Sequence, residues 1–273
     1  MNTLETKTLE QLPPAEMEEM EALYWSKLYD PKAEKAAGVM EFNNLVATSL
    51  ANVDILAFNR VLGFKPDQII TAAQLTRLIR YYREQNVPRF FLAITPELAI
   101  RYHDLLEIHG FVKYNQWAKL YLDLNSIKIA PEREIQIEIP KKHQQEIFAE
   151  IIKQAFDFPA RVGNLFKSAI GKHGYQHFLA FHHQKPISAA SVFLKPPFAS
   201  LSIGATLPSG RGMGAQKALI AHRLKIALEN GCRYVFVETA EDLPEKPSIS
   251  YQNMIKMGFR LAYLRPNYIH YNQ

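Results

Sequence analysis

The stretch LPSGRGMGAQKALI, residues 207–220, combines features that are typical of an anion site. Three glycines and Arg211 lie within positions 210–214, and an apolar, helix-forming run follows. Fixing glycine costs conformational entropy, so such a cluster indicates a backbone that approaches a ligand closely or takes dihedrals closed to other residues. Successive N–H groups at a turn and a helix start form a cradle for negative charge. The stretch therefore predicts a phosphate or pyrophosphate site, and its alternative is a tight turn without a ligand.

Two known phosphate motifs fit this stretch poorly. A Walker A loop needs Gly-Lys-Ser/Thr, but Lys217 follows Gln216 and precedes an alanine. A dinucleotide fingerprint would use Gly210, Gly212 and Ala215, with Glu238 near the place of a ribose-binding acid. Only 58 residues follow Ala215 in a chain of 273, too few for the further βα units of a doubly wound sheet. A strand, a turn and a helix start remain as the elements of the cradle.

Helical and strand patterns alternate along the whole chain. Apolar periodicity predicts helices over residues 72–85, 141–156 and 217–230, and β-rich runs predict strands over residues 90–95, 135–139, 178–182, 188–194, 201–206 and 234–239. Pro186, Gly174 and the pair Pro196-Pro197 separate short strands at close spacing, which favours antiparallel hairpins. The predicted fold class is mixed α/β of the α+β kind.

The two halves of the sequence contain a similar segment. NVPRFFLAIT, residues 86–95, aligns with NGCRYVFVET, residues 230–239, at an offset of 144. Helices that end in HGF or MGF follow both copies. The pattern predicts a duplication with lobes at residues 1–128 and 129–273, each with its own mostly antiparallel sheet flanked by helices. Chance alignment of two helix–strand–helix stretches is the alternative. The first copy has only Gly63 in LGFKPDQIITAAQ, so it lacks the glycine loop.

The block ATLPSGRGMGAQKALIAHRLKIALENGCRYVFVET, followed by SISYQNMIKMGFRLAYLRPNY, resembles the coenzyme-binding core of the GNAT superfamily of N-acyltransferases. The family loop reads Q/R-x-x-G-x-G/A. Arg211, Gly214 and Gln216 stand in its three fixed places, with Gln replacing a small residue. The resemblance implies two tandem GNAT-like lobes, of which only the second binds acetyl-CoA as a co-substrate.

The resemblance also implies which residues hold the coenzyme. The strand before the loop splays from the next strand, pantetheine lies in the gap, and Gly204 suits a bulge there. The implied contacts are Ala205, Thr206 and Leu207 for pantetheine, Arg211, Gly212, Met213, Gly214, Ala215, Gln216 and Lys217 for the pyrophosphate, and Ser250 and Asn253 from the following helix. For the last two, capping of that helix is an equal alternative.

Acyl transfer to an amine needs a proton acceptor and a donor for the departing thiolate. Glu238 ends an apolar strand and is the candidate base, whereas the first copy has Ile94 there. Its alternative is a partner for a nearby arginine. The family's usual tyrosine acid is replaced by Met254, so Tyr251 or Tyr263 becomes the candidate acid. The predicted activity is N-acetylation of an unidentified amine. The alternatives are a non-catalytic acyl-CoA sensor and an aminoacyl transferase that uses aminoacyl-tRNA donors.

Composition excludes several other classes. One cysteine rules out a disulfide framework, and the nine histidines lack metal-ligand spacing, so no metal is expected. A net charge of +5 without a basic stripe does not predict nucleic-acid binding. No segment is apolar enough for a membrane span, so a cytoplasmic protein is expected. The expected partners are a small-molecule or peptide amine and, as a further option, a second copy of the chain. Residues 265–268 line the acceptor site or form ordinary sheet surface.

Overall fold

A computed structural model describes residues 14–127 and 135–272 of the chain. Its strands form one eleven-stranded sheet in the order β1-β2-β3-β4-β11-β5-β10-β9-β8-β7-β6. The strands are β1 (Ala37–Phe42), β2 (Leu45–Leu50), β3 (Arg60–Leu62), β4 (Arg89–Ala93), β5 (Val112–Asp123), β6 (Gln136–Glu138), β7 (Tyr175–His182), β8 (Lys185–Lys195), β9 (Phe198–Thr206), β10 (Tyr234–Ala240) and β11 (Arg260–Tyr271). The helices are α1 (Pro14–Leu28), α2 (Ala72–Glu84), α3 (Pro96–Arg101), α4 (His103–Ile108), α5 (Gln145–Phe156), α6 (Ala160–Ser168), α7 (Ala215–Glu229) and α8 (Ile249–Lys256). The mixed α/β class is confirmed.

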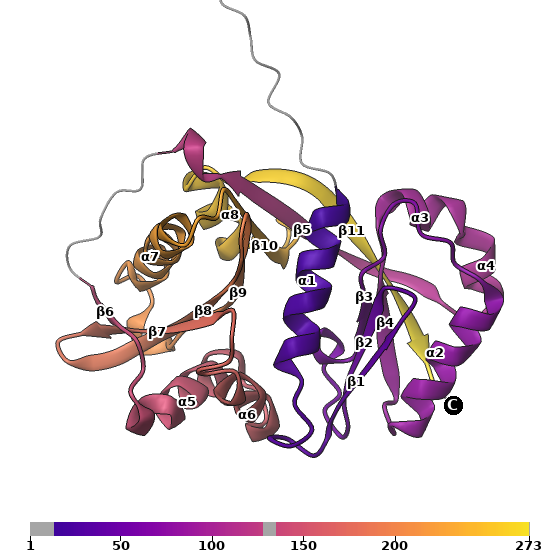
Figure 1. Cartoon of the computed structure of the whole chain (residues 1–273), viewed down its shortest axis with the longest axis horizontal. Helices are drawn as coiled ribbons and strands as arrows, with labels where there is room; N and C mark the ends of the chain where they lie inside the picture. The colour runs from indigo at the N-terminus through magenta and orange to yellow at the C-terminus, as the bar shows by residue number, and fades with distance from the viewer. Residues whose placement is uncertain (1–13, 128–134, 273) are drawn as a thin grey trace, which may run out of the picture.

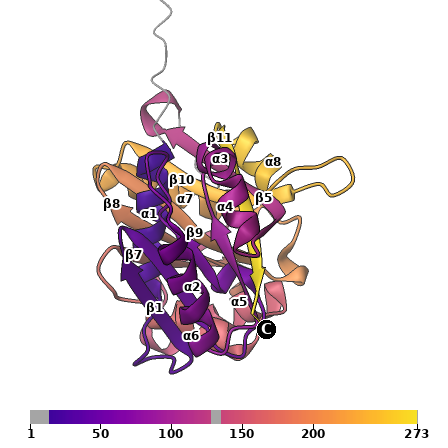
Figure 2. The ribbon, with the colours of Figure 1, turned by 90° about the vertical axis from the view of Figure 1, so that its right-hand side faces the viewer.

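The helices cover the sheet in three groups, each with its own apolar core. Helices α5 and α6 lie on one face of β7–β9, and α7 lies on the other face (Figure 1). Helices α2, α3 and α4 cover the strands β1–β4, as the turned view shows (Figure 2). Helix α1 lies in the middle of the molecule, where it packs against β2 and β3 on one side and against β9 on the other (Figure 1).

The expectation of a separate sheet in each half is wrong. Strand β5 from the first half lies between β10 and β11, and β11 from the second half lies between β5 and β4. These neighbours all pair in antiparallel fashion. Both strands are twelve residues long, and their backbone groups are satisfied only by pairing across the halves. A single continuous sheet results. The predicted boundary at residue 128 lies outside the described residues.

Most predicted elements are present, but helix α1, the β1–β2 hairpin, strand β3 and helix α6 were not predicted. Helix α1 escapes notice because two of its buried residues are the acids Glu18 and Glu21, in a segment that reads as an exposed acidic run. Among the helices of the described residues, not one has the length and the apolar content that crossing a membrane requires.

Candidate functional site

Strands β9 and β10 separate in the middle of the sheet. They pair in parallel only where residues 198–200 of β9 meet residues 234–236 of β10. Beyond Ser200 the pairing stops, although both strands continue. On its other edge, β9 pairs with β8 through a register shift that lies between Leu201 and Gly204. The predicted splay and the irregularity beside Gly204 are both present, and they leave one edge of β9 unpaired.

The glycines of the loop serve two different purposes. Gly212 and Gly214 both have φ of +79°, and a Cβ added at either would meet no atom within 4 Å. Gly210 has ordinary dihedrals, but a Cβ there would lie 2.8 Å from the Cβ of Ile187. Gly210 is therefore needed for close packing on β8, whereas Gly212 and Gly214 turn the chain into α7 and leave open space in front of its first turn.

That open space is a cavity of about 790 Å³ between the loop, α5 and α8. Of the predicted coenzyme residues, those that line it are Thr206, Arg211, Gly212, Gly214, Ala215, Gln216, Lys217, Ser250 and Asn253. Gly204 and Gly210, which the sequence singled out for a bulge and for the loop, also line it, and the lining residues that the sequence did not reveal are Ala155, Phe156 and Ile249. Met213, Ala205 and Leu207 are not among the lining residues. The structure thus brings most of the predicted set around one space.

The backbone of β9 presents alternate residues to this space. The Leu207 N–H donates to the Ile187 carbonyl at 2.9 Å, so Leu207 faces β8. Because successive strand residues point their backbone groups to opposite edges, Ala205 also faces β8, and Gly204 and Thr206 face the gap. Of the three residues predicted to pair with an extended ligand, Thr206 alone has its backbone N–H and C=O on that side.

Helix α8 is fixed against α7 at the far side of the cavity. Its cap is Ser248, whose hydroxyl accepts the Tyr251 N–H at 3.3 Å, so Ser250 is not the capping residue. The Asn253 amide donates to the Gln216 side chain at 2.8 Å. Asn253 therefore holds the loop and α8 together at the cavity wall.

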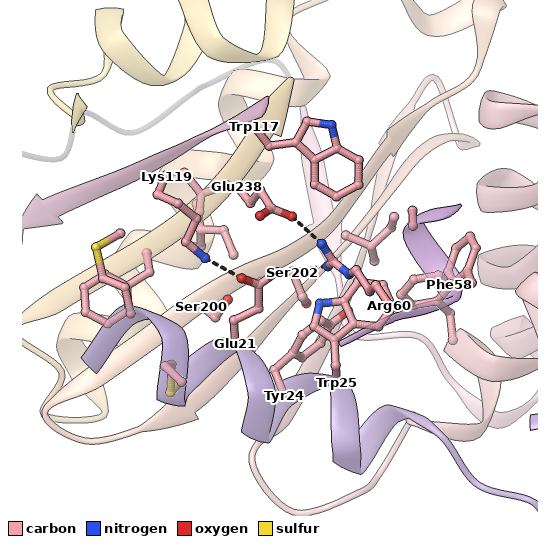
Figure 3. A pocket seen from close by; sticks show the side chains of 18 of the residues that line it. Glu21, Tyr24, Trp25, Phe58, Arg60, Trp117, Lys119, Ser200, Ser202 and Glu238 are labelled. Atoms are coloured by element: carbon pink, nitrogen blue, oxygen red, sulfur yellow. Dashed lines mark hydrogen bonds and ion pairs between the residues drawn. The ribbon is translucent and has the colours of Figure 1, made fainter. Parts of the chain in front are cut away.

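A second cavity, of about 200 Å³, lies at the splay itself. Its walls come from α1, β3, β5, α5, α6, β9 and β10 and from the segments before β3 and after α5, so both halves of the chain build it (Figure 3). Phe156 lines both cavities, which places them side by side. The aromatic residues that line the smaller cavity are Tyr24, Trp25, Phe58, Trp117, Phe156, Phe158, Phe166 and Phe236. We call this space the aromatic cavity and the larger one the loop cavity.

A buried network of ionised groups forms one side of the aromatic cavity. Arg60 contacts Glu21 at 2.9 Å and Glu238 at 2.8 Å. Lys119 pairs with Glu21, and Arg265 pairs with Glu21 and Glu238. Arg265 also contacts Glu18 at 3.0 Å, and the Tyr263 hydroxyl donates to Glu18 at 2.6 Å. Three basic and three acidic side chains balance, which reduces the cost of burying them.

The network holds Glu21 ionised. Burial acts to raise the pKa of Glu21, but Arg265, Lys119 and Arg60 together lower this pKa well below its usual range. Glu18 differs, because its complete burial outweighs Arg265 and raises the pKa of that carboxyl. The two buried acids of α1 therefore act differently, with Glu21 as the fixed negative charge among three cations.

Glu238 stands where the sequence placed a candidate base, but both of its carboxylate oxygens are engaged. Oε1 accepts from Arg60, and Oε2 accepts from Arg265. The alternative of an arginine partner is thus realised. Glu238 still reaches the aromatic cavity, where it is the most exposed of the acids at 14% of its side chain.

The two predicted tyrosines lie away from both cavities. Tyr251 packs against the core beneath α7, and the Tyr263 hydroxyl is held by Glu18. Neither lines a cavity. The phenol that does line the aromatic cavity belongs to Tyr24 on α1, which interacts with the Ser202 side chain. Burial raises the pKa of Tyr24 above its ordinary value, so this phenol keeps its proton.

Sequence reasoning missed the residues that the first half supplies to the aromatic cavity. Arg60 and Lys119 each lie among apolar strand residues, in RVL and WAKLYL. A lone charge in such a run indicates a buried partner, because an unpaired buried charge is too costly. That signal was present in the sequence, but it does not reveal which distant residue is the partner.

The comparisons with known proteins agree on the fold. No known family model and no curated protein sequence matches the chain. A GCN5-related N-acetyltransferase from Kribbella flavida has a TM-score of 0.65 at 14% identity, over 95% of this chain and 95% of that one. A tandem GNAT protein from the clavulanic acid biosynthesis pathway also has a TM-score of 0.65 at 14% identity, over 92% of this chain and 87% of that one. A GCN5-related N-acetyltransferase from Sphaerobacter thermophilus has 0.62 at 12% identity, over 87% and 76%. At such identities the likeness concerns the fold, and the chain has the fold of the GCN5-related N-acetyltransferases.

Proposed function

We propose that the chain is an N-acetyltransferase that transfers an acetyl group from acetyl-CoA to an amine. The proposal rests on one observation, the order in which two cavities and an unpaired strand edge follow one another along β9. The loop cavity opens at the start of α7, the unpaired edge of β9 runs from it, and the aromatic cavity lies at the splay. An elongated ligand with a charged end fits that order.

The residues around the loop cavity suit a coenzyme A pyrophosphate. The first turn of α7 offers N–H groups that no intrahelical carbonyl satisfies, and its dipole favours negative charge. Arg211 and Lys217 add positive charge at the same wall. On β9, the backbone groups of Gly204 and Thr206 are free to pair with the amides of pantetheine. The thioester would then reach the aromatic cavity.

In the reaction, the bound ammonium first gives up one proton to water, and the neutral amine nitrogen then forms a bond to the thioester carbon. The C–S bond breaks, and the second proton of the nitrogen passes to the departing coenzyme A thiolate through water. Tyr24 places its hydroxyl group at the splay, where it stabilises the carbonyl oxygen or the departing sulfur by a hydrogen bond. The Ser202 hydroxyl, which interacts with Tyr24, is itself held by the Ser191 hydroxyl at 2.7 Å. Tyr24 acts as a hydrogen-bond donor, because its raised pKa opposes full loss of the proton. Glu238, held by two arginines, orients the amine, and water carries the proton away.

The strand arrangement supports two tandem lobes that exchange their last strands. Strand β3 pairs in parallel with β4 as β9 does with β10, and each pair is followed by a helical segment and a long strand. In the first lobe the segment between β3 and α2 contains Gly63 but no glycine loop. We assign the first lobe the task of covering the acceptor side, since it supplies α1, Arg60 and Trp117 to the aromatic cavity.

Two measurements test the proposed function. Calorimetric titration with acetyl-CoA should show saturable binding, and a panel of amines should release free thiol above the rate without protein. Saturable binding without thiol release for any amine would support the alternative, a non-catalytic acyl-CoA binding protein. That alternative is favoured by one observation, that both carboxylate oxygens of Glu238 are already engaged. Absence of binding would refute both.

A further inference from the structure

The aromatic cavity is small, and a helix forms one of its walls. Its volume of about 200 Å³ lies below the roughly 300–1,000 Å³ of common ligand pockets. One face of α1 forms a large part of the wall, because the lining residues on this helix recur at helical spacing: Met17, Met20, Glu21, Tyr24 and Trp25. A ligand in this cavity must therefore be compact, and a peptide or a protein side chain on its backbone would meet α1.

The walls are apolar on the side away from the ion network. Phe58, Phe158 and Phe166 form an edge-to-face cluster, and Phe156 stacks on Phe158 with ring centroids 5.0 Å apart. None of these rings carries a polar group. The body of a ligand on this side is surrounded by rings, so a second charge there would lose its hydration without a partner.

The charged side of the cavity presents carboxylates rather than cations. Side-chain exposure is 2% for Arg60 and 3% for Lys119, against 8% for Glu21 and 14% for Glu238. Two rings also cover the faces of the Arg60 guanidinium. Its Cζ lies 4.4 Å from the ring centroid of Trp25 and 5.1 Å from that of Trp117. Figure 3 shows these two rings on either side of Arg60, with Glu238 beside it. An incoming charged group therefore meets an acid first.

We propose that the acceptor is a small primary amine that carries one positive charge and a compact aromatic or branched apolar body. This inference rests on the proposed function and specifies its substrate class. The ammonium group lies against Glu238, and the body packs on the phenylalanine rings. A polyamine is disfavoured because its second charge would lie among rings, and an acidic compound is disfavoured because it would face the carboxylates.

The chain provides its own reporter for this test. The sequence contains two tryptophans, Trp25 and Trp117, and both line the aromatic cavity. Binding in the cavity should change their fluorescence, whether or not acetyl transfer follows. The full-length protein is titrated with 2-phenylethylamine and with three matched probes: 3-phenylpropionate for the opposite charge, spermidine for added charges, and the tripeptide Phe-Gly-Gly for length.

We expect saturable binding of 2-phenylethylamine, with affinity at least tenfold above that of each other probe. The Ala57→Phe variant places a ring at the cavity wall and should weaken that binding at least tenfold, while the affinity for coenzyme A, which lacks the acetyl group, stays unchanged. Equal or tighter binding of any matched probe would overturn the inference. So would the absence of a saturable change up to about 1 mM, the upper range of ordinary KM values.

Failure of this inference and failure of the proposed function give different results. Thiol release with spermidine or the tripeptide, but not with 2-phenylethylamine, would refute the substrate class and leave acetyl transfer intact. Binding of 2-phenylethylamine and of acetyl-CoA without thiol release would refute acetyl transfer and leave the ligand class of the cavity standing.

Discussion

Arg60 of β3 and Glu238 of β10 form an ion pair at 2.8 Å although 178 positions separate them in the sequence. This contact joins the two halves of the chain at the wall of the aromatic cavity. Arg60 also binds Glu21 of α1, so a single guanidinium connects three elements. The second half alone therefore lacks a partner for one oxygen of Glu238 and lacks one side of its cavity.

Removing this guanidinium should destabilise the protein strongly. We expect Arg60→Met to lower the free energy of unfolding by about 3 kcal/mol, since the change leaves a buried carboxylate without one of its partners. Arg89→Met is the matched control, because its ion pair with Asp54 at 2.7 Å is partly exposed and should contribute less than about 1 kcal/mol. Urea unfolding measures both. Equal losses in the two variants would contradict the assigned role of Arg60.

Local patterns in the sequence were sufficient for the elements around the loop. Gly212 and Gly214 have the positive φ that their spacing suggested, and the strand before them splays beside Gly204 as the resemblance implied. The loop dihedrals depend on residues that are neighbours in the chain, so the sequence alone predicts them. The splay was implied only by the family resemblance, because β9 and β10 are separated in the chain by all of α7.

The shared sheet and the ion network depend on contacts between distant residues. Pairing of β5 with β10 brings Lys119 beside Glu238, and no local pattern distinguishes this from pairing within one half. Glu18 and Glu21 read as surface acids because their partners lie on β3, β5 and β11. Tyr24 was not a candidate in the sequence for the same reason, since it reaches the splay only when α1 packs across both halves.

The glycine loop gives a test that separates backbone strain from ligand binding. Gly214→Ala forces a side chain into φ of +79° at an open position, so the expected cost is about 1–2 kcal/mol of strain and a weaker hold on acetyl-CoA. Gly231→Ala is the matched control, because Gly231 has φ of +76°, equally open surroundings and no place in the loop cavity. Calorimetry should show reduced acetyl-CoA affinity only for Gly214→Ala, and a similar reduction in both variants would argue against the loop.

Tyrosine substitutions distinguish the sequence-based acid from the one that the cavity presents. We expect Tyr24→Phe to reduce kcat by at least about tenfold, because the removed hydroxyl lies at the splay where charge develops. Tyr251→Phe should have little effect, since Tyr251 lines neither cavity. Thiol release at saturating acetyl-CoA and amine measures both. A loss confined to Tyr251→Phe would restore the assignment made from the sequence.

His177 should make stability depend on pH below neutrality. It is buried on β7 beside Phe148, its Nε2 has no hydrogen-bond partner among the residues that the structure describes, and burial lowers its pKa from 6.5 to about 4. Between these values the unfolded chain binds a proton that the folded chain does not, so stability falls as pH drops from 6.5 toward 4.

The pKa shift of His177 corresponds to a decrease in the free energy of unfolding on the order of 3 kcal/mol, at about 1.36 kcal/mol per pKa unit. Burial also lowers the pKa values of His222 and His270, so both histidines make stability fall with decreasing pH in the same direction as His177. The difference between the wild-type protein and His177→Phe isolates the His177 part, because phenylalanine keeps a ring of similar shape at this position. Urea unfolding at several pH values should give a shallower slope for the variant between pH 4 and 6.5. Parallel slopes would mean that His177 titrates in the folded protein much as it does in the unfolded chain.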